Sequence, residues 1–449
     1  MESYILRLPD ELLEGIFRSA CYTSPDNPNY RFINPTAASA ALCLVCRRFY
    51  HIALPHLYAE FCVDYDFEDY ARKGEAKDPD RVHSSCAQSP SLWPLCRRLA
   101  LHCNDELSDN ETLEVLLDLT KWFSNTQTFF LSNLGRLDGP WSILRSALMN
   151  FSALIELDVS GEHTYDMELG KVIETLGDIR SSQIQTLKLG GVSLDENTSV
   201  SKRLLRTLAG TASFTTLELR RFLQTPEILE HLVKWPASLE TFKLDYTYGV
   251  WHRVNRRYND WSLSTLQPIL AIHQTTLRYI SISHIDKGGL SGFDMRDFPK
   301  LQELRLSEAT TSRGSRNPIA EAHLIPNLLA PRLSVFHWDM TLEVDSHMET
   351  IQDFAQGEED FLRAFAREAI KAKCPLRLLK ITYTPEGIGL DPNSKYPWDR
   401  LDTLDREFQP SGVRLHYNTP TISREEYLVG LERLRKRLDN SARHYQHTH

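Results

Sequence analysis

The chain has 449 residues, of which 41% are hydrophobic, 10% aromatic and 25% charged, and its formal net charge at pH 7 is −9. This composition is typical of a folded protein with a large apolar core, and it confines disorder to local segments. The negative charge disfavours a nucleic-acid-binding protein, which would normally carry a basic surplus.

Targeting and redox features favour an intracellular protein. The eight cysteines are scattered singly along the chain, which is typical of a reducing compartment. No apolar run reaches the roughly 18 residues that a bilayer span needs, and the amino terminus MESYILRLPDE has no basic region before its apolar residues. We therefore expect a cytoplasmic or nuclear protein without a membrane span or signal peptide.

The first 62 residues carry two helical patterns. The segment ILRLPDELLEGIFRSA places apolar residues on one side of a helix that begins near Pro9. After the polar loop 23–35, the segment TAASAALCLVCRRFYHIALPHLY repeats apolar residues at helical spacing. A unit this small cannot bury all of these side chains by itself, so we expect some of them to contact a partner.

These two patterns resemble the F-box, the helical module that docks onto the Skp adaptor of cullin-based ubiquitin ligases. The resemblance lies in Leu8-Pro9, Glu11-Leu12-Leu13, Ile16-Phe17 and Val45-Cys46-Arg47-Arg48-Phe49. The ending ALPHLYAEF looks like F-box proteins of filamentous fungi. The sequence departs from the family in its longer, Pro-rich loop between the helices and in Phe49, which stands where many members carry Trp.

The resemblance covers residues 1–62 and implies that this module binds the Skp adaptor and, through it, a cullin. It implies a role at the adaptor interface, by direct contact or as support, for Leu8, Pro9, Leu12, Ile16, Val45, Cys46 and Phe49. We expect Leu8, Pro9 and Leu12 to touch the adaptor, because inserted apolar anchors dominate interface energy. The alternative is that several of the seven only form the core of the module.

Cys43 and Cys46 form a C-x-x-C pair, which by itself could suggest zinc or redox chemistry. They lie in an Ala- and Leu-rich helical pattern, and no second pair or histidine cluster stands at ligand spacing. Because a buried free cysteine commonly behaves as a small hydrophobe, we expect no metal and no cofactor.

A repeat follows a polar segment. Residues 63–95 are charged and poor in aliphatic side chains, so they predict a linker or insertion. From 96 to 422 the spacing L-x-x-L-x-L, as in LIELDVSG at 154–161, returns at intervals of about thirty residues. Ten copies of this frame begin at Cys96, Thr126, Leu154, Ile184, Phe214, Leu239, Leu277, Leu301, Leu333 and Leu376.

On an extended strand the last two apolar residues of the frame point the same way, so each copy predicts a short one-sided strand. Segments with helical periodicity, such as 111–123 and 225–235, lie between the copies. Such units cannot bury their apolar sides alone, so they must stack into an array with a parallel sheet inside and helices outside. The frame resembles a degenerate leucine-rich repeat, although only Asn104 fits the Asn or Cys ladder of that family. The alternative is a doubly wound α/β domain.

We therefore expect an α/β protein with an all-helical F-box at 1–62, a linker at 63–95 and an irregular leucine-rich-repeat solenoid at 96–422. Residues 423–449 begin with a capping box and continue as an amphipathic helix. This helix is expected to cap the open end of the array, which terminal repeats must do. Membrane binding is the weaker alternative.

Two groups of residues are candidate contacts for a protein target. The outward strand positions Asp158, Lys188, Glu218 and Lys243 alternate in sign, which predicts a charge ladder on the sheet face. This ladder is either a recognition surface or a solvated face that contributes little energy. The inserted segment 245–261 interleaves aromatic side chains with cations, and its candidates are Trp251, Arg253, Arg256 and Arg257. Such residues are frequent in interface hot spots, but they could also pin the segment onto its own array.

No catalytic motif is recognisable in the sequence, and no catalytic residue is predicted. We expect a non-catalytic substrate-recognition subunit of an SCF-type ubiquitin ligase, which holds an unknown protein target near the ligase. One alternative is a scaffold that uses the F-box without a cullin. Another is an undetected hydrolase, which would need a deep pocket with perturbed carboxylates or histidine. Neither a nucleic acid nor a membrane is expected as a partner.

Overall fold

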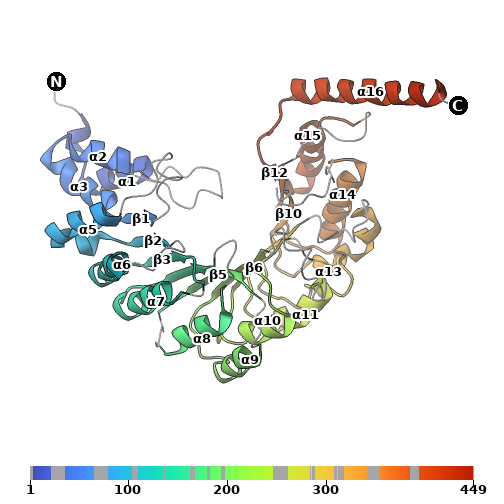
Figure 1. Ribbon diagram of the computed structural model, residues 1–449. Coiled ribbons are helices and arrows are strands. Elements are labelled where there is room, and N and C mark those ends of the chain that lie inside the picture. Colours follow the sequence, from blue (N-terminus) through green and yellow to red (C-terminus); the bar gives the residue numbers. More distant parts are fainter. Residues whose placement is uncertain are drawn as a thin grey trace. The chain divides into compact units, whose positions relative to one another are not determined.

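The computed structural model describes residues 4–21, 36–64, 79–103, 110–135, 137–161, 167–178, 183–193, 198–245, 261–283, 285, 289–307, 311, 318–341, 354–384 and 394–447. These residues form an α/β fold of parallel strands and helices, drawn in Figure 1. The chain divides into two compact units, which we call unit 1 (Met1–Leu208 and Ala212–Phe214) and unit 2 (Ala209–Thr211 and Thr215–His449).

Unit 1 begins with a helical module of η1 (Tyr4–Arg7), α1 (Asp10–Cys21), α2 (Thr36–Cys43) and α3 (Arg47–Leu57). Helix α1 starts directly after Pro9, and the acidic Asp10 and Glu11 in its first turn complement the helix dipole. The second helical pattern of the sequence is divided into α2 and α3. The division is stabilised by Cys46, whose thiol accepts the N–H of Phe49 at 3.5 Å and so caps α3.

The module has a small core of its own. Leu13, Phe17, Phe49 and Ala53 are all nearly inaccessible to solvent, and the rings of Phe17 and Phe49 meet edge to face with 4.9 Å between centroids. Arg48 ties α3 to the start of α1, because its guanidinium binds the Asp10 carboxylate at 2.6 Å and also the Leu8 carbonyl. The three helices therefore pack as one unit.

The rest of unit 1 contains, within its described residues, five parallel strands that neighbour one another in chain order. In Figure 1 the helices α6 to α8 lie along one side of these strands. The elements after the module are β1 (Glu60–Asp64), α5 (Pro79–Gln88), η3 (Pro90–Leu95), β2 (Arg98–His102), α6 (Asn110–Trp122), β3 (Thr128–Ser132), α7 (Asp138–Asn150), β4 (Glu156–Ser160), α8 (Leu169–Asp178), β5 (Thr186–Val192) and α9 (Thr198–Thr207).

Unit 2 has seven parallel strands among its described residues, again in chain order. Its elements are β6 (Thr216–Phe222), α10 (Pro226–Val233), β7 (Thr241–Asp245), α11 (Leu263–Ala271), β8 (Tyr279–Ile282), β9 (Glu303–Ser307), η5 (Pro318–Leu324), α13 (Ile325–Leu328), β10 (Val335–Thr341), α14 (Gln356–Lys371), β11 (Leu378–Thr384), α15 (Pro397–Phe408), η6 (Gln409–Ser411), β12 (Arg414–Tyr417) and α16 (Arg424–His447).

One backbone joint recurs between neighbouring repeats, at the starts of β2 to β5 and of β7 to β11. The carbonyl of Arg97 accepts the N–H groups of both Gln127 and Thr128, at 2.7 and 3.0 Å. One repeat later, the carbonyl of Gln127 accepts those of Ile155 and Glu156, at 2.8 and 2.9 Å. Unit 2 has the same joint, for example from Arg278 and Tyr279 to Glu240. Main-chain atoms thus join the repeats at this edge.

The strand order decides between the two architectures that the sequence allowed. A doubly wound domain reverses its strand order at a switch point, whereas the strands here follow the chain within each unit. The parallel sheet with stacked strand and helix units is therefore confirmed. All ten frames form strands, and their last two apolar residues are buried, as at Leu157 and Val159 of β4, which are both 0% exposed.

The structure adds two strands to the ten expected. β1 pairs with β2 in register from Glu60 to Asp64, and β12 pairs with β11. The expected linker 63–95 therefore contains the end of β1, and it also holds α5 and η3. At the other end of the chain, α16 buries Tyr427 and Leu431, while Leu438 is 47% exposed. Among the side chains of α16 that the structure describes, which end at Leu438, the buried ones lie in its first turns.

Candidate partner-binding surfaces

The helical module exposes large apolar side chains next to its core. In α1, Leu13 and Phe17 point into the module, while Leu12 and Ile16 are 56% and 44% exposed. These two residues are four apart, so they lie side by side on the outer face of the helix. In the turn between α2 and α3, Leu44 is 87% exposed and Val45 is 60% exposed. We call Leu12, Ile16, Leu44 and Val45 the module surface.

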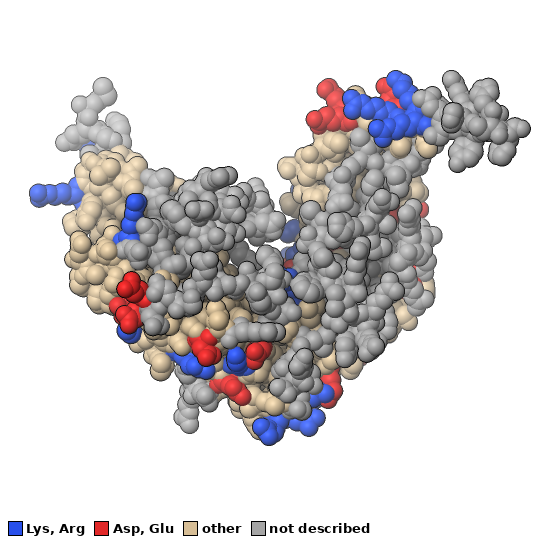
Figure 2. Space-filling view, viewed as in Figure 1, with Lys and Arg blue, Asp and Glu red and all other residues tan. Residues whose placement is uncertain are grey.

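The first turn of α3 lies against the start of α1. Arg48, in the first turn of α3, contacts Asp10 and the Leu8 carbonyl at the start of α1. Leu44 and Val45 directly precede α3. On the face drawn in Figure 2, few charged side chains appear over the module, at the upper left. An apolar surface of this kind is typical of a protein-binding site.

The seven residues of the F-box resemblance fall into two groups. Pro9, Leu12, Ile16 and Val45 are exposed and available to a partner. The others support the fold: Phe49 lies in the core, Leu8 and Cys46 pack half-buried against it, and Cys46 also caps α3. Of the three residues expected to touch the adaptor, Leu8 is thus the least accessible.

Sequence reasoning missed Leu44, the most exposed large apolar residue of the module surface. The segment ALCLVCRR contains neither Gly nor Pro and continues the helical pattern, so nothing marked a turn. The residue that caps α3 is Cys46. A thiol is an uncommon N-cap, whereas Ser, Thr, Asp and Asn are the usual ones, so this helix start was not recognised.

In unit 1, the predicted ladder residues Asp158 and Lys188 are register partners on β4 and β5. Lys188 forms an ion pair with Glu156 at 2.7 Å, and its side chain is 25% exposed. Asp158 is buried, with 6% of its surface accessible. Lys188 therefore offers more contact surface to a target than Asp158 does.

In unit 2, Glu218 and Lys243 form the ion pair that the strand register predicts, with 3.3 Å between the carboxylate and the ammonium. Lys243 also lies over the Tyr279 ring, 5.7 Å from its centroid. The side chain of Lys243 is 41% exposed, against 17% for Glu218. Lys243 is accordingly the most accessible of the four ladder residues.

Further along the same face of unit 2, His337 and Asp339 are buried, whereas the Arg305 side chain is 38% exposed. Arg305 on β9 binds Asp339 on β10, and the His337 ring nitrogen Nε2 lies 2.7 Å from the Thr382 hydroxyl. Burial lowers the pKa of His337 to about 3, with help from the positive charge of Arg305. Burial opposes ionisation of Asp339, but the charge and hydrogen bonds of Arg305 outweigh it and lower the pKa of that carboxyl. These residues are held as a fixed network.

Trp251, Arg253, Arg256 and Arg257, the candidates in the inserted segment, lie outside the described residues. Across the part of the chain that is described, no group of three or more His, Cys, Asp or Glu side chains could hold a metal ion. Among the same residues, no helix combines the length and the apolar character that crossing a membrane requires.

Comparison with protein-family models finds no match to this chain, and no curated protein matches it.

Proposed function

We propose that this chain is a non-catalytic substrate-recognition subunit of an SCF-type cullin ubiquitin ligase. In this proposal the N-terminal module binds the Skp adaptor and the repeat array binds a protein target. The observation that carries it is the module surface. Its four large apolar side chains are 44% to 87% exposed, although the module has a complete core without them.

The energetics favour a partner that covers more than these four residues. Fully burying a Leu, Ile or Val side chain contributes about 1.5–3 kcal/mol, so burying the exposed parts of all four would contribute about 4–7 kcal/mol. Association itself costs an estimated 4–15 kcal/mol. A stable complex therefore needs further contacts, for which Ile5 and Tyr50, at 39% and 43% exposed, and the exposed Pro9 are available.

The role of the array in this proposal is to hold a target. Each unit has an accessible cation on its sheet face, Lys188 in unit 1 and Lys243 in unit 2, and such a cation suits a protein surface of complementary charge. The chain itself carries out no bond chemistry. Binding a target and the ligase together raises the effective concentration of the target near the catalytic subunits.

A pull-down with matched variants tests the adaptor interface. The full chain carrying Leu12→Asp and Val45→Asp should lose the Skp adaptor, because both side chains are exposed in the free module and would place charges in an apolar interface. We expect at least a hundredfold weaker binding. Met149→Asp is the control, since Met149 is 70% exposed in α7, outside the module, and should leave binding unchanged.

Two results would contradict the proposal: wild-type chain that retains no adaptor, or a double variant that binds as well as wild type. Co-purification of a cullin with the adaptor complex separates a ligase subunit from a scaffold. Retention of adaptor without cullin would favour the scaffold.

A further inference from the structure

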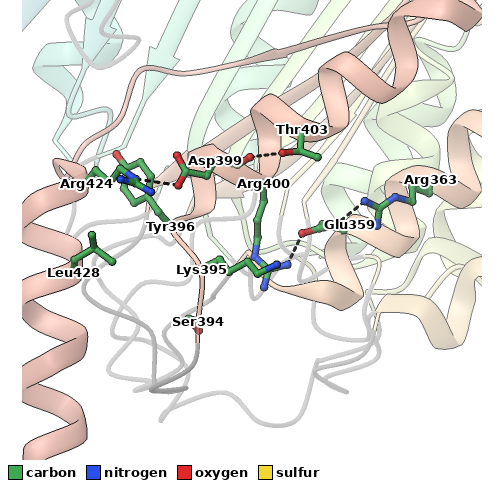
Figure 3. Close-up of a pocket in the computed structure, with 10 residues that line it drawn as sticks. All are labelled: Glu359, Arg363, Ser394, Lys395, Tyr396, Asp399, Arg400, Thr403, Arg424 and Leu428. Carbon is green, nitrogen blue, oxygen red and sulfur yellow. Dashed lines mark hydrogen bonds and ion pairs between the residues drawn. The ribbon is translucent and has the colours of Figure 1, made fainter.

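The charged cavity of unit 2 is lined by side chains that pair with one another (Figure 3). It measures about 530 Å³ and lies between α14, α15 and the first turns of α16. Arg424 binds Asp399 at 3.0 Å, and Arg363 and Arg400 both bind Glu359. Because opposite charges at contact distance attract, these pairs hold the three helices together. A reactive pair of side chains lies instead in the helical module of unit 1.

Cys43 and Cys46 lie at the two ends of the turn between α2 and α3. The sequence pattern predicted one helix through both, but Cys43 ends α2 and Cys46 is the N-cap of α3. Between them, Leu44 and Val45 donate their N–H groups to carbonyls three residues earlier, at 3.2 Å each. Both cysteines pack half-buried against the module core. The two side chains therefore lie on the core side of one short turn.

The structure shows both side chains as thiols, and both are partly accessible to solvent. Two cysteines that follow in unit 1 differ, since Cys86 and Cys96 are 1% and 0% exposed. Burial also raises the pKa of the Cys96 thiol to about 12, so that this thiol stays protonated and unreactive. A soluble oxidant therefore reaches Cys43 and Cys46 more readily than these two.

We propose that Cys43 and Cys46 form a reversible disulfide by exchange with a small-molecule disulfide such as oxidised glutathione. One cysteine thiolate attacks a sulfur of the glutathione disulfide, and the first glutathione leaves as a thiolate that takes up the proton the cysteine has lost. The second cysteine thiolate attacks the mixed disulfide, and the second glutathione leaves in the same way. Two cysteines are oxidised, and one glutathione disulfide is reduced to two thiols.

The disulfide would change the turn that carries half of the module surface. The new sulfur–sulfur bond draws the Cys46 sulfur toward Cys43 and away from the Phe49 N–H, which it accepts at 3.5 Å in the thiol form. Helix α3 then loses its cap. Leu44 and Val45, which are 87% and 60% exposed, lie inside the closed ring. We expect the adaptor to bind the disulfide form more weakly. This consequence rests on the proposed function, whereas the disulfide itself does not.

Peptide mapping of the full chain tests whether the disulfide forms. After incubation with oxidised glutathione, trypsin cleavage at Arg31 and Arg47 gives the peptide 32–47, which contains both cysteines and no other. We expect this peptide to be two hydrogens lighter than its reduced form and unreactive toward iodoacetamide, and dithiothreitol should reverse both. A glutathione adduct on either cysteine, a link to a third cysteine, or two alkylated thiols would overturn the proposal.

Hydrogen exchange measures the effect on α3 without any partner. In the disulfide form the Phe49 amide should exchange about tenfold faster than in the thiol form, because its acceptor has moved. The matched variant is Cys43→Ser, which cannot form the disulfide and leaves Cys46 as the cap. Its Phe49 amide should exchange at the thiol-form rate with or without the oxidant. Equal rates in the two forms of the wild type would overturn the predicted loss of the cap.

Affinity for the Skp adaptor, measured by calorimetry, separates this switch from the proposed function. The wild type should bind about tenfold more weakly as the disulfide, and Cys43→Ser should bind equally with and without the oxidant. Cys374→Ser is the control, since Cys374 lies in unit 2, and it should respond as the wild type does. Equal affinity of the two wild-type forms would contradict the switch and leave the proposed function standing. A thiol form that binds no adaptor would contradict the proposed function and leave the mapped disulfide standing.

Discussion

At the scale of single residues, neighbouring apolar residues of the module differ in role: some are buried in its core, and others are exposed. Phe49 is 4% exposed and packs against Phe17, whereas Leu12 is 56% exposed beside the buried Leu13. A helical pattern alone does not separate these tasks, because all four residues are apolar. Burial in the folded module decides which side chains stabilise it and which can bind a partner.

Substitution to alanine should reveal this division. Phe49→Ala should lower the free energy of unfolding of the module by about 3–5 kcal/mol, because it removes a core ring and leaves a cavity. Leu12→Ala should change stability by less than about 0.5 kcal/mol, as exposed substitutions do. Hydrogen exchange of the α1 and α3 amides measures the loss of stability in each variant. Equal loss of protection in the two variants would contradict the assignment.

His337 should make the stability of unit 2 depend on pH. Its pKa is lowered from 6.5 to about 3 by burial first and by Arg305, Lys380 and His416, with Asp339 acting in the opposite direction. Between these two values the unfolded chain binds a proton that the folded chain does not, so stability falls as pH falls below 6.5. The slope from one such proton approaches about 1.4 kcal/mol per pH unit.

Urea unfolding at pH 7 and pH 5 measures this effect. In His337→Gln the loss of stability between the two pH values should be smaller than in wild type, because the titrating ring is gone. The variant should also be less stable than wild type at pH 7, since its contact with the Thr382 hydroxyl is altered. An unchanged slope would show that His337 does not titrate as described.

At the scale of elements, strand positions followed from the sequence better than strand number. The ten frames gave ten strands because two apolar residues on one face are needed wherever a strand packs on a shared core. β1 was missed although Tyr58, Phe61 and Val63 repeat the same spacing with aromatic and β-branched residues. β12 was missed because Gly412 stands at the first position of its frame.

The candidate sites followed from the sequence only in part. The Glu218–Lys243 pair could be derived, because strand register follows from the repeat. The exposure of Leu44 could not be derived from the sequence, because it depends on the break between α2 and α3.

The terminal helix α16 should contribute stability through its first turns alone. Tyr427 is 1% exposed and its ring lies 5.5 Å from that of Tyr396, whereas Leu438 is 47% exposed. Tyr427→Ala should therefore destabilise unit 2 by about 3 kcal/mol or more, and Leu438→Ala by less than about 0.5 kcal/mol. Thermal unfolding, followed by circular dichroism, compares the stability of the two variants with that of the wild type. Similar losses would mean that the whole helix packs on the array.

At the scale of the whole molecule, the uncovered module surface should affect association. Contiguous exposed apolar patches favour self-association when the natural partner is absent. The purified chain should therefore show an average mass above 51.7 kDa in light scattering at raised concentration. The Leu12→Asp and Val45→Asp variant should shift toward 51.7 kDa, because the added charges keep the patches apart. Identical masses for the two proteins would argue against an accessible patch.

The joint between repeats also bears on how such a chain can be rebuilt. Since one carbonyl receives two successive amides, the joint does not depend on which side chains flank it. Excising 127–154 would bring Ile155 and Glu156 to the place where Gln127 and Thr128 meet Arg97. The shortened chain should fold, with circular dichroism close to that of the parent. Whole repeats of the array could then be removed, or exchanged between positions, without redesign of their neighbours.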